Sequence, residues 1–400
     1  MIKKILDSLF STKASGLYIL IFAITIGFAT FIENDFGTSA AQKVIFKSFW
    51  FELLLVLFGL SIVMNIYRFR MFQQRKWAIL LFHFSIIIIL AGAGITRYFG
   101  SEGRIHIREG EDSNTLISNE TYLRFRVKTS NGKRYTFSEP VHFASLGKNK
   151  FSKSYQIGPQ LFDFNLVQFI PNPKNEITTD SNGKPILKIV ISGGDGREEY
   201  FLHETESKLI HNTLFNFNKE GIEGAINILY QGNDLSFIAP DSISQFQMAI
   251  NKTDWLPSGL LHPLLVRTLY STSAIKFVIA DFKPNAKLTL KSDSRKMNSG
   301  SMASLIFDIK VNGRNEKMEI SGSQGLEGEF KGIQIGESEV EMAYGSKEIQ
   351  LPFRLRLNDF ILERYPGTNS PASYASEVTL IDPTENIHRD QRIYMNHVLD

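Results

Sequence analysis

The stretch Trp77-Ala-Ile-Leu-Leu-Phe-His83-Phe-Ser-Ile-Ile-Ile-Ile-Leu-Ala-Gly-Ala-Gly-Ile95 is apolar along almost its whole length and carries one ionisable side chain, His83. It has the length of about 20 residues that one helical crossing of a bilayer needs. A charged side chain at that depth costs roughly a few kcal/mol, so such residues usually face a cavity or a partner. Imidazole is also a common ligand of haem iron. His83 is therefore the leading candidate for a functional residue, and a hydrogen bond to a polar group of a neighbouring helix is the alternative.

The position of His83 within its span predicts where its partner comes from. At about six residues into the stretch and about 1.5 Å per residue, His83 lies roughly 9 Å beyond the start of the span. Its helical neighbours three and four positions away are all apolar: Ile79, Leu80, Ile86 and Ile87. We therefore expect the partner of His83 to come from another helix or from a cofactor.

Two further stretches, Ala14–Ile32 and Phe49–Tyr67, are also long and apolar enough to span a bilayer. Basic clusters lie before the first span and between the second and third: Lys3, Lys4 and Lys13, then Arg68, Arg70, Arg75 and Lys76. The positive-inside rule places both clusters in the cytoplasm. The chain is then a multi-pass protein of the cytoplasmic (inner) membrane, and everything after Arg97 lies on the extracytoplasmic, periplasmic side. Cleavage of the first span as a signal peptide is an alternative that leaves this orientation unchanged. Glu52, at the start of the second span, is expected to be interfacial.

The composition of the chain excludes several classes of protein. Its 400 residues include no cysteine, which excludes disulfides, CxxC redox chemistry, thiolate zinc sites and covalent attachment of haem to this chain itself. The net charge of +3 is close to neutral, so the sequence predicts no nucleic-acid partner.

Beyond about residue 103 the sequence changes to short runs that alternate between apolar and polar residues, beginning with Arg104–Arg108. Three pairs of such runs, separated by turn residues, predict β-hairpins: 123–127 with 134–137, 187–191 with 199–202, and 305–311 with 317–320. Further strands are predicted at 225–230, 276–280 and 353–357, and a short helix within 260–270.

These patterns together predict a membrane α plus all-β fold. Three N-terminal transmembrane helices form a membrane domain at residues 1–100. A large extracytoplasmic β-sandwich or open-barrel-like region follows at residues 101–400, and the Ser-rich segment 293–304 divides it into two lobes.

The β region carries no recognisable catalytic constellation. Its histidines are scattered, so surface or core roles are expected for His106, His142, His203, His211 and His262. The pair His388 and His397 flanks a short polar run, for which metal binding is the alternative to a structural role.

Several stretches of this chain together resemble a known family. They are Ala29–Thr38, Glu102–Glu111, Leu351–Phe353, Asp359–Gly367, Tyr374–Val378 and Tyr394–Asp400, with the His83 span between the first two. They resemble the ResB (CcsB) half of the cytochrome c biogenesis proteins of the ResB/CcsA type, most closely the fused CcsBA form. The resemblance extends over essentially the whole chain.

The resemblance implies a membrane complex that carries haem out of the cytoplasm and joins its vinyl groups to the two thiols of CxxCH in an apocytochrome c. His83 matches a histidine that is thought in that family to ligate haem during transport, so haem is the expected, transiently handled ligand. The expected partners are a CcsA-like haem-handling half, fused or in trans, and the apocytochrome c. The basic cluster of Arg68, Arg70, Arg75 and Lys76 could attract haem propionates, with a role as a topology signal as the alternative.

The chain also departs from the family pattern. It has three tryptophans and lacks the Trp-rich segment that belongs to the CcsA half, so it is expected to be the front portion of a cytochrome c synthase whose catalytic half lies elsewhere. The element Tyr365–Gly367 is either a turn or a part of the apocytochrome surface. The alternative to a haem function is a membrane-anchored periplasmic β-domain that acts as a chaperone or envelope scaffold without haem.

Overall fold

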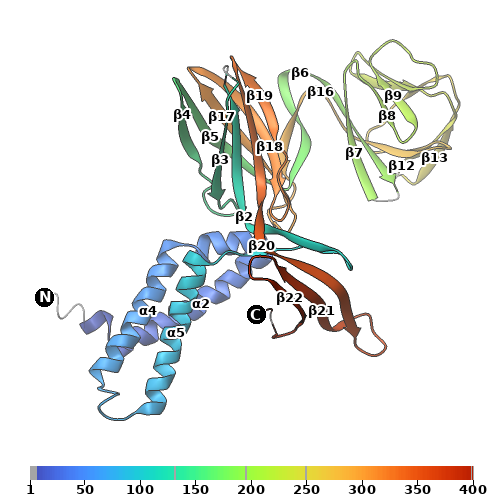
Figure 1. Ribbon diagram of the computed structural model, residues 1–400. Helices are drawn as coiled ribbons and strands as arrows, with labels where there is room; N and C mark the ends of the chain where they lie inside the picture. The colour runs from blue at the N-terminus through green and yellow to red at the C-terminus, as the bar shows by residue number, and fades with distance from the viewer. Residues whose placement is uncertain (1–6, 130–131, 194–195, 248–249, 398, 400) are drawn as a thin grey trace. The chain divides into compact units, whose positions relative to one another are not determined.

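The computed structural model describes residues 7–129, 132–193, 196–247, 250–397 and 399 of the chain. Its helical part comes first and its strands follow (Figure 1). The helical elements are α2 (Thr12–Phe36), α3 (Thr38–Ala41), the π-helical turn η1 (Gln42–Phe46), α4 (Phe49–Arg68) and α5 (Trp77–Phe99). Helices α2, α4 and α5 have 25, 20 and 23 residues and are long and apolar enough to cross a membrane. The three predicted spans are therefore present as helices.

The chain divides into two compact units. Unit 1 comprises residues 1–173 and 292–400, and unit 2 comprises residues 174–291. Unit 2 is thus inserted into the sequence of unit 1, with borders at Pro173/Lys174 and Lys291/Ser292. The segment 293–304, where the sequence predicted a divide between lobes, begins just after the second border.

Unit 1 holds two sheets besides its helices. The seven-stranded sheet comprises β1 (Gly103–Arg104), β2 (Asp112–Lys128), β3 (Arg134–Val141), β19 (Lys331–Ile335), β20 (Ser338–Arg364), β21 (Pro371–Asp382) and β22 (Ile387–Tyr394). The four-stranded sheet comprises β4 (Ser152–Ile157), β5 (Gln160–Pro171), β17 (Met302–Val311) and β18 (Arg314–Ser323).

One aromatic core joins these two sheets into a sandwich. Phe125 from the larger sheet and Phe164 and Phe307 from the smaller one are fully buried in it. The rings of Phe125 and Phe164 lie 4.6 Å apart between centroids. Burial of a large aromatic side chain contributes about 1.5–3 kcal/mol, so this cluster is the main source of cohesion in the sandwich.

Unit 2 has its own two sheets and its own core. The five-stranded sheet comprises β8 (Ser207–Ile210), β9 (Thr213–Phe217), β10 (Ile226–Gln231), β11 (Asp234–Ile238) and β14 (Leu261–Pro263). The six-stranded sheet comprises β6 (Pro173–Gly193), β7 (Gly196–His203), β12 (Ile243–Gln247), β13 (Lys252–Leu256), β15 (Leu269–Ser271) and β16 (Lys276–Ser292). The predicted fold class, three membrane-type helices followed by a large β region, is therefore confirmed.

All three predicted hairpins form: β2 pairs with β3, β6 with β7 and β17 with β18, each antiparallel. The hairpin of β17 and β18 has its turn at Asn312 and Gly313, whose φ angles of 48° and 82° are the positive values that a two-residue hairpin turn requires. The turn residues 130–131 and 194–195 of the other two hairpins lie outside the described residues.

Two local predictions are wrong. The segment 260–270 forms no helix, because its apolar residues pair as β14 with β11 and as β15 with β12 and β16. A short apolar run does not distinguish a helix from a strand by its periodicity alone. Of the alternating run Arg104–Arg108, only Arg104 pairs, as the second residue of β1, so His106 lies in irregular chain.

Candidate functional site

His83 lies on the face of α5 that packs against α4. Leu80, one turn earlier on α5, is buried in a cluster with Ile62 and Ile66 of α4 and with Met71. Ile87, one turn later, packs against the same cluster. Because residues at spacings of three and four share a helix face, His83 falls on this stripe, and it is half-buried there.

The imidazole of His83 has a partner on its own helix. Its Nδ1 lies 2.8 Å from the carbonyl oxygen of Ile79. The expectation that its own helix offers no partner is therefore wrong, because it considered side chains and overlooked the backbone carbonyl four residues earlier. A carbonyl oxygen only accepts, so Nδ1 carries the proton and the lone pair of the neutral ring lies on Nε2.

The stripe that contains His83 continues along α5 toward the β region. The residues Leu80, His83, Ile87, Leu90, Gly94 and Arg97 alternate spacings of three and four, the repeat that keeps side chains on one helix face. Over the 14 residues from His83 to Arg97, at about 1.5 Å per residue, the stripe runs about 21 Å.

The stripe ends at an ion pair between two helices. The guanidinium of Arg97 on α5 lies 3.1 Å from the carboxylate of Glu52 on α4, and both side chains are mostly buried. Arg97 also donates to the carbonyl oxygen of Phe46 in η1. Glu52 was expected to lie at the membrane–water interface, and the structure shows that its carboxylate pairs with Arg97.

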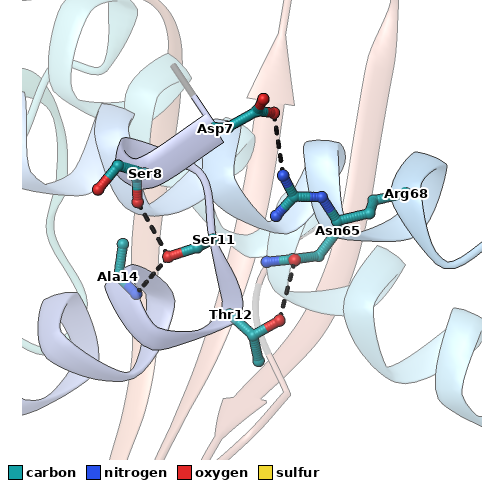
Figure 2. Close-up of polar contacts among 7 residues, drawn as sticks. All are labelled: Asp7, Ser8, Ser11, Thr12, Ala14, Asn65 and Arg68. Carbon is teal, nitrogen blue, oxygen red and sulfur yellow. Dashed lines mark hydrogen bonds and ion pairs between the residues drawn. The ribbon is translucent and has the colours of Figure 1, made fainter. Parts of the chain in front are cut away.

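Polar contacts also join the beginning of α2 to the end of α4, far from the Arg97–Glu52 ion pair (Figure 2). Thr12 donates to the side-chain oxygen of Asn65 at 3.2 Å, and Asn65, which is only 5% exposed, donates to Ser15 at 2.9 Å. Arg68 pairs with Asp7 at 2.9 Å. Arg68 is thus already engaged by a carboxylate, while the attraction of haem propionates to this basic cluster stays a prediction.

A cavity of about 1230 Å³ lies between helices α4 and α5 and the base of the β-sandwich in unit 1. Its floor is formed by apolar side chains of the two helices, among them Leu55, Leu60, Val63, Ile87 and Leu90. Ile87, Leu90, Gly94 and Arg97 of the α5 stripe all line it. The helix face that presents His83 is therefore continuous with the floor of the cavity.

The roof of the cavity is polar. His142, which follows β3, lies there with Thr121 and Tyr344, and burial raises the pKa of Tyr344 to about 12. The pKa of His142 is lowered to about 4, mainly by burial and also by the nearby charges of Lys47 and Lys43, which outweigh the opposing effect of Glu120. His142 is therefore a neutral imidazole at physiological pH.

One roof hydroxyl is left without a partner. Ser323 is only 2% exposed, and its buried Oγ has no hydrogen-bond partner among the described residues. Ser323 lines the cavity. A buried polar atom left unpaired costs about 1–3 kcal/mol, so Ser323 is a local cost to the stability of unit 1.

His106 also lines the cavity, whereas the remaining histidines do not assemble a site among the described residues. His397 stacks on Tyr394 with 3.9 Å between ring centroids, His388 lies in β22, and His211 bonds to Glu198 at 2.7 Å. Within the residues that the structure describes, no three His, Asp or Glu side chains converge as a metal site. His142 and Ser323 could not be singled out from the sequence, because neither sits in a motif and only the fold brings them to the cavity.

A sequence model of the ResB-like family matches residues 73–163 and 324–400. The resemblance to ResB is confirmed. The first matched segment contains α5 with His83 and continues through His142, whereas unit 2 lies entirely between the two segments.

The chain is also similar to protein NrfI of Wolinella succinogenes, with 25% identity over 399 residues. That similarity covers 100% of this chain and 30% of NrfI, so the chain spans about a third of the length of this relative.

Proposed function

We propose that this ResB-like chain acts in cytochrome c biogenesis as the subunit that handles haem and docks the apocytochrome. In this proposal His83 ligates haem iron through Nε2 while haem crosses the membrane. The β-rich units then lie on the extracytoplasmic side of the inner membrane, where the apocytochrome is matured.

The geometry of His83 carries the proposal. Its Nδ1–H group is held by the Ile79 carbonyl, which fixes the tautomer and orients the ring. Metal-binding histidines commonly donate their second ring N–H to such an oxygen, because the hydrogen bond makes the other nitrogen a better ligand. Within the described residues, Nε2 of His83 has no hydrogen-bond partner, so its lone pair is available to iron.

The proposed orientation is supported by charge. Four basic residues stand at the last residue of α4 and in the loop to α5, at the ends of these helices remote from the β region: Arg68, Arg70, Arg75 and Lys76. The positive-inside rule assigns that end to the cytoplasm. Haem would then meet His83 first and the cavity later.

A partner completes the function that we propose. Joining a haem vinyl group to a cysteine thiol adds sulfur and hydrogen across the vinyl double bond. We assign that step to a CcsA-like half, fused or in trans. The length of NrfI, of which this chain matches 30%, is compatible with such a second half.

The experiment that tests this role compares His83→Ala with wild type in the assembled complex. Loss of an iron ligand weakens binding by at least about tenfold, so we expect less co-purifying haem and less mature cytochrome c. Added imidazole should restore haem binding to the variant, because it supplies the missing nitrogen ligand. His203→Ala, an exposed histidine of unit 2, is the matched control and should behave as wild type.

Unchanged haem content and unchanged cytochrome c maturation in His83→Ala would reject the role of that side chain. A purified wild-type complex without haem absorbance would reject haem handling altogether and would favour a membrane-anchored scaffold.

A further inference from the structure

We propose that two copies of this chain associate through the free edge of β13 in unit 2, as an antiparallel pair of strands centred on Thr253. Strand β13 is the outermost strand of the six-stranded sheet. It pairs with β12 on one side, and on its other side no strand of the described residues pairs with it. This association goes beyond the proposed function and does not depend on haem.

The free edge of β13 calls for a partner that is itself a strand. An unpaired edge presents a row of backbone N–H and C=O groups, which another strand can satisfy. The acyl chains of a bilayer cannot satisfy them, so a membrane surface is a poor partner for this edge. The side chain of Trp255 projects from the same strand and is 74% exposed.

The charges of β13 restrict which strand can pair with it. Lys252 and Asp254 lie on one face of the strand, and their ammonium and carboxylate groups are 3.0 Å apart. This is the inward face, because Asp254 pairs with Gln245, which is 5% exposed and donates to Tyr270 in the core. Inward charges on an edge strand exclude an arbitrary partner, because that partner would cover them without supplying opposite charges.

A second copy of β13 supplies the opposite charges in one register. When the antiparallel pair is centred on Thr253, Lys252 of each copy lies opposite Asp254 of the other, and the two Thr253 residues lie opposite each other. Opposite-charge pairs and Thr–Thr pairs both stabilise an antiparallel ladder. Trp255 is then diagonal to Thr253 of the second copy, within the reach of an aromatic side chain.

Neighbouring registers are unfavourable. Centring the pair on Lys252 places the two lysines opposite each other, and centring it on Asp254 does the same with the two aspartates. Like charges directly opposite destabilise a ladder. A shift of one strand by a single residue moves its side chains to the other face of the sheet and separates the charged pairs. The sequence of β13 is therefore complementary to itself in the register centred on Thr253.

The contact is small, so the dimer should be weak and reversible. Stable interfaces bury about 1,200–2,000 Å², which is more than one short strand provides. Both copies are held in one membrane by their helices, however, and such tethering raises the effective concentration at which they meet. A two-fold axis also gives each copy the same contact twice, Lys252 to Asp254 and Asp254 to Lys252.

Oxidative crosslinking of the full chain in membranes tests the register, because the chain has no cysteine of its own. Opposite residues of an antiparallel pair have Cα atoms about 4.5–5.5 Å apart, within the range of about 4.4–6.8 Å that a disulfide spans. Thr253→Cys should therefore form a disulfide-linked dimer. Leu209→Cys is the matched control, because Leu209 is 66% exposed on β8, the outermost strand of the other sheet of unit 2. It should crosslink far less.

Exchanging the charges tests the complementarity in the Thr253→Cys background. Lys252→Asp sets aspartates opposite aspartates, and Asp254→Lys sets lysines opposite lysines, so each should lower the crosslinked fraction about tenfold. The double variant with both exchanges should recover it. Co-expression of the two single variants in one membrane should also recover it, because an acidic strand then pairs with a basic one. That recovery requires both variants to be folded.

Three results would overturn the proposal. The first is equal crosslinking of Thr253→Cys and Leu209→Cys, and the second is crosslinking of Thr253→Cys that ignores the charge exchanges, because both indicate random collision. The third is a Thr253→Cys variant that stays monomeric and becomes shielded from a maleimide when apocytochrome c is added. That result would assign the edge of β13 to the client protein.

Discussion

The backbone of Gly37 lies directly against the carbonyl oxygen of Met297, so close that a Cβ atom on Gly37 would be 1.9 Å from that oxygen. Gly37 ends α2 with a φ of 91°, and Met297 belongs to the loop that leads into β17. The carbonyl of the preceding Phe36 accepts hydrogen bonds from Met297 N at 3.1 Å and from Ser145 Oγ at 3.0 Å. The end of the first helix is thus docked on the β-sandwich through backbone contacts that only glycine permits.

Gly37→Ala should therefore destabilise unit 1. The positive φ alone costs a side chain about 1 kcal/mol, and the clash with Met297 adds to it, so we expect a loss of about 2 kcal/mol or more. Thermal unfolding in detergent measures the effect. Gly27→Ala in the same helix is the matched control, because a Cβ there meets nothing within 4 Å. Equal unfolding midpoints for both variants would contradict this docking.

The ion pair between Arg97 and Glu52 should couple α5 to α4. Both side chains are less than a third exposed, at 27% and 29%, so the pair is shielded from solvent. A double-mutant cycle with Arg97→Met and Glu52→Gln should give a coupling free energy of about 1 kcal/mol. The pair of Arg68 and Asp7, with side chains 43% and 54% exposed, is the control, and its coupling should fall below about 0.5 kcal/mol. The prediction fails if the two pairs couple equally.

The membrane spans and the hairpins were predictable from sequence because local patterns encode them. An apolar run as long as α5 forms a membrane-spanning helix in nearly all cases. Asn312-Gly313 specifies a tight hairpin turn, because both residues tolerate the positive φ angles that such a turn requires. The short apolar run at 260–270 was misassigned because neighbouring strands, which are distant in sequence, decide its conformation.

The candidate site was predictable only in part, for the same reason. His83 stands out because its surroundings in the sequence are apolar. His142 follows β3 and Ser323 ends β18, 181 residues apart, and only the folding of the sandwich onto the helices brings both to one cavity. The backbone partner of His83 was missed because hydrogen bonding to a carbonyl depends on the rotamer, which the sequence does not specify.

Lys43 should make the stability of unit 1 depend on pH in the alkaline range. Burial lowers its pKa from 10.5 to about 8 in the folded chain, where its amino group donates to the side-chain oxygen of Asn149. Between pH 8 and 10.5 the unfolded chain binds a proton that the folded chain does not, so stability rises with pH across that window. Below pH 8 the cost of burying the charge is fully present in the folded state.

Lys43→Met should remove that cost, raise the unfolding midpoint at neutral pH and flatten its rise between pH 8 and 10.5. The side-chain oxygen of Asn149 keeps a partner in the variant, because it also accepts from Ala144 N at 3.1 Å. Lys148→Met, on the loop that faces η1, is the control and should leave the alkaline slope unchanged. A wild-type midpoint that falls across this window contradicts the assignment.

Asn65 should hold α2 to α4 through its hydrogen bonds to Thr12, which Figure 2 shows, and to Ser15. Hydrogen bonds between membrane helices contribute on average about 0.6 kcal/mol each, so Asn65→Leu should cost about 1 kcal/mol of stability. Ser15 would keep partners, because its hydroxyl can also donate to Ser61 Oγ at 2.9 Å or to the Ser11 carbonyl at 3.2 Å, and this limits the loss. Unfolding in detergent is the measurement, and Met64→Leu at the exposed neighbouring position is the control. If Asn65→Leu proves as stable as Met64→Leu, packing alone holds the two helices together.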